Sequence, residues 1–143
     1  MSEVVWTAAT TQARLDRNPF SRLLQLRAVT VREEYAELEL PITEQVSQML
    51  GLVHGGAVAT LIDSACAACL WPHLEAQGIS AVTLEMKINF LATPRGAFAR
   101  AQASLLRFGR TTAYTECSVT DESGKLCARA SATFFLLRGE APA

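Results

Sequence analysis

The chain has 143 residues, of which 50% are hydrophobic and 19% are charged. This length suits one domain, and this composition excludes a disordered chain. The chain has thirteen basic and fourteen acidic residues, and the basic ones form no long run. This argues against binding to nucleic acid or to an anionic membrane surface. No stretch reaches the roughly 18 apolar residues of a membrane span, and residues 1–20 lack the basic start and apolar block of a secretory signal. We therefore expect one cytoplasmic domain over residues 1–143.

The first third of the chain predicts a loose arm, a short helix and a strand. Residues 1–17 show no periodicity and are expected to form a loosely held N-terminal arm. Asn18-Pro19 is typical of a helix start, because Asn caps the first turn and Pro suits the first helical position. From residue 28 to residue 42 apolar and polar side chains alternate, which predicts one half-buried strand.

Residues 51–77 have the helical period instead. Apolar side chains recur three and four positions apart, and small residues fill most of the remaining circumference. A helix that is apolar nearly all round is a buried helix. Gly55-Gly56 is expected to open this helix and Gly78 to end it, and Pro72 should kink or fray its last turn.

The rest of the chain alternates again and predicts four more strands, at residues 80–92, 97–108, 111–120 and 125–138. Because tight turns join them, the strands must be antiparallel. One strand, a long buried helix and four strands together predict an α+β fold with the helix on one face of the sheet. One helix cannot cover both faces of a five-strand sheet, so the other face and the long edge invite pairing with a second chain.

The cysteines and histidines favour neither a disulfide nor a metal site. The pair Cys66 and Cys69 lies inside an apolar run, and no second CxxC supplies two further zinc ligands, so core packing is the favoured role. The two histidines, His54 and His73, are 19 residues apart and form no HxxxH pair. We therefore expect no metal and no cofactor.

The start of the long helix is the chemically unusual segment. Two glycines there, Gly55 and Gly56, would present bare backbone N–H groups where the helix dipole is positive. Asp63 falls near the middle of an otherwise apolar helix, where an unpaired carboxylate costs several kcal/mol, so it is expected to have a partner or a task. A plain helix entry and an Asp satisfied by local hydrogen bonds remain the alternatives.

Four segments carry a resemblance to a known family: the pattern GxVHGGxxxxLxD at residues 51–63, TLEMKINFLATPRG at 83–96, FGR at 108–110 and VTDESGKLCARASATF at 119–134. Over about residues 48–137 the chain resembles the hotdog-fold acyl-CoA thioesterases, close to the PaaI-like (phenylacetate-degradation) branch. The resemblance implies an antiparallel sheet wrapped around a central helix, sheets of two subunits joined edge to edge, and active sites at the subunit interface. Ala67 stands where another hotdog branch carries Thr, which favours the PaaI-like branch.

The same resemblance implies roles for individual residues. The N–H of Gly55 would polarise the thioester carbonyl, and Asp63 would act as general base on water or as nucleophile. Gln48 stands where PaaI-like members usually carry Asn, Thr83 stands where a Ser or Thr positions water, and His54 would fix the loop. The residues implied in substrate binding are Gly56, Gly109 and Arg110. From its own chemistry, Arg110 is either a contact for the coenzyme A phosphates, since Arg pairs well with phosphate oxygens, or a solvated residue after a turn. Arg95, Arg107 and Arg129 are competitors for the phosphate contact.

Helix geometry adds a constraint on these roles. Gly55 and Asp63 are eight helical positions apart, which is a rise of about 12 Å. One thioester carbon cannot lie within about 3 Å of two groups that far apart on one helix. If both act on one substrate, they must come from different chains, so we expect a homodimer. A homotetramer made of two such dimers is a further expectation, which this geometry does not decide.

The leading hypothesis is hydrolysis of a small, medium-chain or aryl acyl-CoA to the free acid and coenzyme A. A hotdog dehydratase or hydratase would need a differently placed His as base, whereas His54 lies in the HGG segment. The alternative outside catalysis is a module that binds or senses acyl-CoA in the same cleft. Asp63 argues against that module, because binding alone gains nothing from a carboxylate beside an anionic ligand.

Overall fold

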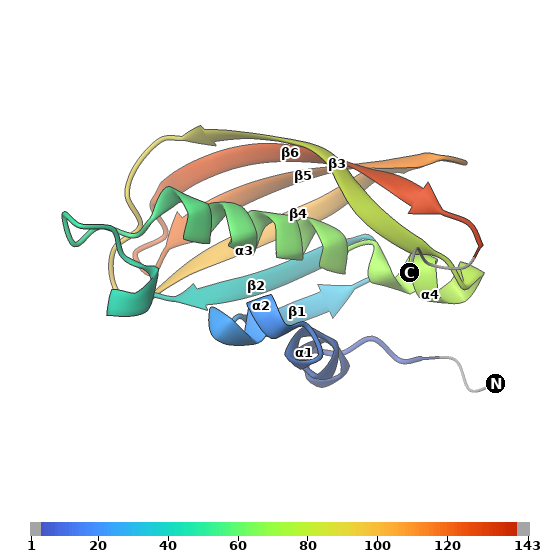
Figure 1. Cartoon of the computed structure of the whole chain (residues 1–143), viewed down its shortest axis with the longest axis horizontal. Helices are drawn as coiled ribbons and strands as arrows, with labels where there is room; N and C mark the ends of the chain where they lie inside the picture. Colours follow the sequence, from blue (N-terminus) through green and yellow to red (C-terminus); the bar gives the residue numbers. More distant parts are fainter. Residues whose placement is uncertain (1–3, 140–143) are drawn as a thin grey trace.

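The computed structural model describes residues 4–139 as one antiparallel sheet wrapped around a central helix (Figure 1). The strands are β1 (Arg27–Arg32), β2 (Tyr35–Pro41), β3 (Ser80–Phe90), β4 (Phe98–Phe108), β5 (Thr112–Asp121) and β6 (Leu126–Leu137). The helices are α1 (Ala8–Asp16), α2 (Pro19–Leu23), the 3-10 turn η1 (Glu44–Val46), α3 (Gly55–Ala68) and α4 (Trp71–Gln77). The sheet order β1-β2-β4-β5-β6-β3 places β1 and β3 at the two edges. The α+β fold expected from the sequence is confirmed.

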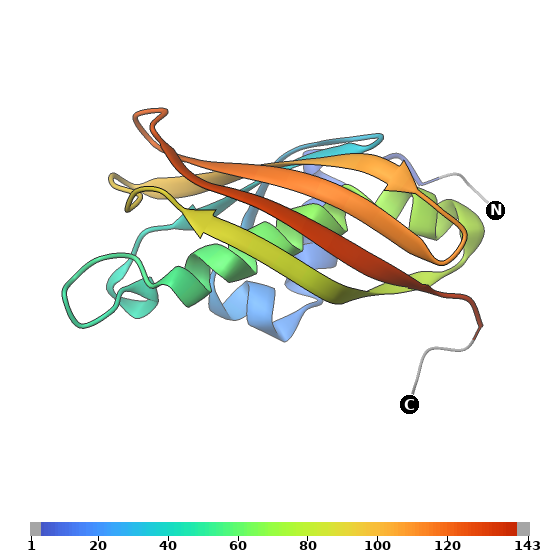
Figure 2. The ribbon, with the colours of Figure 1, turned by 90° about the horizontal axis from the view of Figure 1, so that it is seen from above.

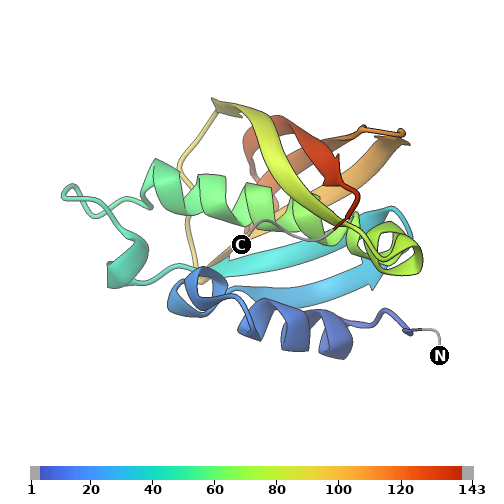
Figure 3. The same cartoon turned by 45° about the vertical axis from the view of Figure 1, so that its right-hand side comes forward.

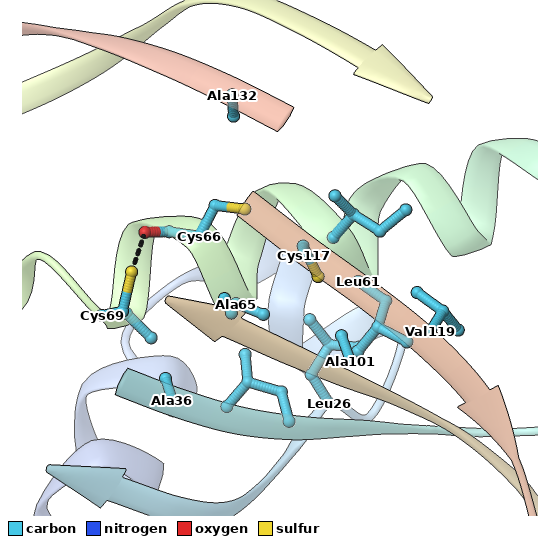
Figure 4. Packing of buried hydrophobic residues seen from close by; sticks show 14 of the residues in the cluster. Leu26, Ala36, Leu61, Ala65, Cys66, Cys69, Ala101, Cys117, Val119 and Ala132 are labelled. Atoms are coloured by element: carbon cyan, nitrogen blue, oxygen red, sulfur yellow. Dashed lines mark hydrogen bonds between the residues drawn. The ribbon is translucent and has the colours of Figure 1, made fainter. Parts of the chain in front are cut away.

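The hydrophobic core lies between α3 and the concave face of the sheet (Figures 2 and 4). The side of α3 that faces the sheet carries Leu61, Ile62 and Ala65, which are fully buried. Opposite them, three successive inward positions of β4 are small, at Ala99, Ala101 and Ala103. Small side chains on the sheet let the helix approach closely, so its own larger side chains fill the space at interior packing density.

The helix expected over residues 51–77 begins at Gly55 and is divided into two. Pro72 has no N–H and clashes with the carbonyl one turn earlier, so the chain breaks after Ala68 and restarts as α4, bent by 44° from α3. Gly78 ends α4 in the left-handed conformation, with φ of 61°. Among residues 4–139 no single helix is long and apolar enough to cross a membrane, although α3 and α4 together meet that test by length and composition.

The expectation of a loose arm over residues 1–17 is wrong for residues 8–16, which form α1. Thr7 caps this helix, and its hydroxyl accepts a hydrogen bond from the Thr10 N–H. Gln12 anchors α1 to β1, since its side chain accepts from the Ala28 N–H and donates to the Leu26 carbonyl. Only two residues of α1 are buried, Thr11 and Leu15, which is too few for an apolar periodicity to show in the sequence. Residues 1–3 lie outside the described part of the chain.

The single strand expected at 28–42 is two strands, so the sheet has six strands instead of five. A tight turn at Glu33 and Glu34 joins β1 to β2, and Glu34 adopts the left-handed conformation with φ of 64°. That conformation usually requires Gly or Asn, and neither residue marks this turn. In space α1 and α2 lie beside β1 and below α3, whereas β3 and β6 lie on the other side of α3 (Figure 3).

Candidate active site

His54 and the two glycines fix the start of α3. His54 is the cap residue, and its Nδ1 accepts a hydrogen bond of 2.8 Å from the Gly56 N–H. A side chain at residue 56 would come within 2.9 Å of that Nδ1, so the packing of His54 requires Gly56. The N–H of Gly56 is therefore occupied, whereas the N–H of Gly55 has no acceptor among the described residues. Of the two glycines, only Gly55 has a donor to offer to a ligand.

The loop before α3 is a hydrogen-bonded hairpin that extends beyond the start of the helix (Figure 1). Ser47 pairs with Val53, and the Gln48 N–H donates to the Leu52 carbonyl at 2.8 Å. Gly51 turns the chain with φ of 77°. The side-chain carbonyl of Gln48 accepts the Leu50 N–H, so Gln48 holds its own loop and has only its NH₂ group left as a donor.

Asp63 has the hydrogen-bond partner that was expected for a carboxylate in an apolar helix. Its Oδ1 accepts a hydrogen bond of 2.7 Å from the hydroxyl of Thr83 on β3. The Asp63 carboxylate is half-buried and borders a hollow of about 240 Å³. The hollow lies between α2 and α3, and its other lining residues are Asn18, Phe20, Ser21, Ala59, Thr60, Ser64 and Met86. The structure thus brings Asp63 and Thr83 together beside a space that can hold a ligand.

A second hollow, of about 190 Å³, lies beside the first one. It is bordered by His54, Gly56 and Ala57 at the start of α3, and by Leu24 and Val46. Phe20 and Thr60 border both hollows. The sequence did not predict that α2 lines these hollows. Asn18-Pro19 predicts the helix α2, but no sequence signal indicates that α2 lies against α3.

Two of the expected site residues, Gly109 and Arg110, lie far from Gly55 within one chain. Gly55 faces the ring of Phe90, at the end of β3. Arg110 follows Gly109 in the turn between β4 and β5, where Thr111 accepts from the Leu136 N–H beside the start of β3. The length of β3 separates these two ends by roughly 30 Å. Gly109 is required by the turn itself, since a side chain there would come within 2.9 Å of the Thr112 carbonyl.

Comparison with known proteins decides the family. The family model of the thioesterase superfamily matches residues 50–128. The chain belongs to the thioesterase superfamily. That match contains the start of α3, Asp63 and Thr83, whereas Gln48 and the α2 residues that line the hollow lie outside it.

Individual relatives agree with this assignment. The chain is similar to a 1,4-dihydroxy-2-naphthoyl-CoA hydrolase of Listeria monocytogenes, with 31% identity over 101 residues, 71% of this chain and 81% of that protein. It is also similar to the mouse acyl-coenzyme A thioesterase 13, with 30% identity over 113 residues, 77% of this chain and 79% of that protein. These relatives confirm a thioester hydrolase and favour it over the non-catalytic binding module.

Solved structures confirm the hotdog fold. A thioesterase family protein from Silicibacter pomeroyi superposes with a TM-score of 0.82 at 27% identity, covering 92% of this chain and 98% of that one. The PaaI protein of E. coli, from the phenylacetic acid degradation operon, superposes with a TM-score of 0.80 at 21% identity, covering 92% and 94%. At 21% identity, the likeness to the PaaI protein shows the fold alone.

The cysteines of this thioesterase lie in its core. All four cysteines are free and buried, and burial raises the pKa of the Cys69 thiol, so this thiol stays protonated and unreactive. Within residues 4–139 no three His, Cys, Asp or Glu side chains gather in a way that could hold a metal ion.

Proposed function

We propose that this thioesterase hydrolyses a small, medium-chain or aryl acyl-CoA to the free acid and coenzyme A, at a site shared by two protomers. The observation that carries the proposal is the Asp63 carboxylate, which the Thr83 hydroxyl holds at 2.7 Å beside a hollow. The second element is the unoccupied N–H of Gly55 at the positive end of the same helix. A carboxylate and an oxyanion donor are the two groups that thioester hydrolysis needs.

The reaction follows from these two groups. Asp63 takes a proton from water, and the water oxygen bonds to the thioester carbon. The electron pair of the carbonyl moves to its oxygen, where the Gly55 N–H stabilises the charge. The carbonyl then re-forms, the C–S bond breaks, and the sulfur of coenzyme A receives the proton from Asp63. In the other route an Asp63 oxygen attacks the thioester carbon, the C–S bond breaks, and the coenzyme A thiolate leaves and takes a proton from solvent. Water then hydrolyses the resulting anhydride, which releases the free acid and restores the Asp63 carboxylate.

The spacing along α3 supports a site made by two chains. Gly55 and Asp63 are separated by a rise of about 12 Å, so they cannot reach one thioester from a single helix. The strand next to Asp63 is suited to joining two copies, because β3 is a sheet edge of 11 residues. Apolar side chains are exposed along it, with Val82 46% and Leu84 58% exposed. An edge of this length and character is a template for pairing with another chain.

The positions of Gly55 and Asp63 also predict the register of that pairing. Gly55 lies beside Phe90, and Asp63 lies beside Thr83. A two-fold axis that brings Phe90 of one copy opposite Thr83 of the other must pass near Met86 and Lys87. The same axis moves the start of the partner's α3 toward the turn that carries Arg110, so Arg110 is available for a coenzyme A phosphate. Pairing of two such dimers into a homotetramer stays a prediction.

Replacing the carboxylate tests the proposed chemistry. In an assay of thiol release with benzoyl-, phenylacetyl- and medium-chain acyl-CoA, the wild-type protein should turn over at least one substrate. Asp63→Asn should lower kcat about 10²- to 10⁴-fold, because it removes the general base or nucleophile, while acyl-CoA still binds. Near-normal kcat in this variant would contradict the role of Asp63. Binding without release by the wild-type protein would contradict the hydrolase.

A further inference from the structure

The two hollows along α3 are neighbours with a common wall. One borders Asp63 and Ser64, and the other borders His54 and Gly56 near the start of the helix. Thr60 forms part of the floor of both, and its hydroxyl is bonded to the Gly56 carbonyl at 2.9 Å. Phe20 projects from α2 and is the large side chain that borders both spaces. Phe20 and Thr60 are therefore the two residues that the hollows share, and Phe20 is the larger of them.

The volumes show what this wall does. The hollows measure about 240 Å³ and 190 Å³, and each is smaller than the roughly 300–1,000 Å³ of ordinary small-molecule pockets. Joined together they would fall inside that range. A side chain that separated them would limit the length of the group that can extend from Asp63 along the helix.

The lining of the hollow beside Asp63 also disfavours a long alkyl chain. Ser21 and Ser64 line it, and no side-chain hydrogen bond is found for either hydroxyl within residues 4–139. Ser21 is only 3% exposed. Covering such hydroxyls with methylene groups would cost free energy, whereas a short or polar acyl group leaves them solvated or bonded.

We propose that Phe20 closes the acyl end of the site and restricts this thioesterase to compact acyl groups. The inference rests on the proposed function and adds its specificity: the acyl group lies between α2 and α3, and Phe20 stops it from reaching the second hollow. Phe20 acts by occupying space, so its removal should change which substrate is used more than how fast the bond breaks. It is a specificity-determining residue, and the chemistry remains with Asp63 and Gly55.

The test compares chain-length profiles of Phe20→Ala and the wild-type protein. The assay is thiol release with acetyl-, butyryl-, hexanoyl-, octanoyl-, decanoyl- and benzoyl-CoA. In Phe20→Ala the ratio of kcat/KM for decanoyl-CoA to kcat/KM for butyryl-CoA should rise at least about tenfold, mainly through a lower KM for the long chain. Phe20→Trp should leave the ratio unchanged or lower it. Since Phe20 is 54% exposed, its truncation should leave the fold intact.

Leu23→Ala is the matched control, because Leu23 lies on the same short helix, is 73% exposed and borders neither hollow. It should leave the ratio within about twofold of wild type, as expected of a surface change. The inference is overturned if Phe20→Ala changes kcat/KM equally for every chain length, or if Leu23→Ala shifts the ratio as much. A wild-type protein that releases no thiol from any substrate would instead overturn the proposed function itself.

Discussion

The Thr83 hydroxyl on β3 donates a hydrogen bond of 2.7 Å to Asp63 Oδ1 on α3. This bond joins the two elements that the proposed site needs: the central helix and the edge strand on which a second copy would pair. It also orients the carboxylate, since one of its oxygens is held and the other is left for a water molecule or a substrate.

Removal of that hydroxyl should weaken catalysis. Thr83→Val keeps the shape of the side chain and loses the hydrogen bond. A hydrogen bond to a charged group contributes about 1.5–3 kcal/mol, and Thr83 is exposed in one protomer, which favours the lower end of that range. The kcat for thiol release should therefore fall about tenfold. Thr83→Ser keeps the hydroxyl and should retain most of the activity. Equal losses in the Val and Ser variants would show that the hydroxyl is not what matters.

A proline at residue 55 should remove one donor and leave the helix intact. Gly55 is the first residue of α3, a position where Pro is well tolerated, and His54 already has the extended backbone that precedes Pro, with φ of −67° and ψ of 133°. Gly55→Pro should lower kcat about 10²- to 10³-fold, the usual cost of one oxyanion donor.

The control for this prediction is Gly55→Ala, which keeps the N–H. Its side chain would meet the Phe90 ring at 3.6 Å, an ordinary contact, so its activity should stay near that of wild type. Circular dichroism should show the same helix content in both variants. Full activity in Gly55→Pro would mean that this N–H takes no part in the reaction.

Because of the turn between β5 and β6, the free energy of unfolding should fall as the pH is lowered into the acid range. Asp121 is buried, and its Oδ1 accepts hydrogen bonds from the hydroxyl and N–H of Ser123 and from the N–H of Lys125. The Ser123 hydroxyl is the main cause that lowers the pKa of Asp121 below its ordinary value. A lowered pKa in the folded state means that the charged form stabilises the fold at neutral pH, and that this contribution is lost as pH falls through the folded pKa.

Urea unfolding of Asp121→Asn at several pH values measures this contribution. The variant should have a lower free energy of unfolding than wild type at pH 7, and the difference should shrink in acid below the ordinary carboxyl pKa. The control is Glu116→Gln, on the exposed side of β5, which should change the free energy of unfolding little at any of these pH values. A difference that stays constant with pH would contradict the assigned role of the charge.

Much of the fold and of the site follows from local sequence signals. The alternation in residues 80–138 predicted four strands that the structure confirms, and Gly55 and Gly78 predicted the start of α3 and the end of α4. A partner for Asp63 was expected because a lone carboxylate in an apolar helix is costly. The partner is Thr83, the residue expected to position water.

The features that the sequence did not predict have physical causes of a different kind. The turn at Glu34 is left-handed without Gly or Asn, so composition gave no sign that β1 and β2 are separate strands. The helix α1 is held by the Gln12 side chain and by few buried residues, which produce no periodicity. The wall formed by Phe20 and Ser21 depends on where α2 lies relative to α3, and that is a tertiary contact between segments about 40 residues apart.

In the proposed reaction, Gly55 of one chain and Asp63 of another act on the same substrate. Co-expression of Asp63→Asn and Gly55→Pro chains with different affinity tags allows the mixed dimer to be purified. Each variant alone should be nearly inactive, whereas the mixed dimer has one site with both native groups and should recover about half of the wild-type kcat per dimer. If the two groups act within one chain, every site in the mixed dimer lacks one of them, and its activity would stay as low as that of the single variants.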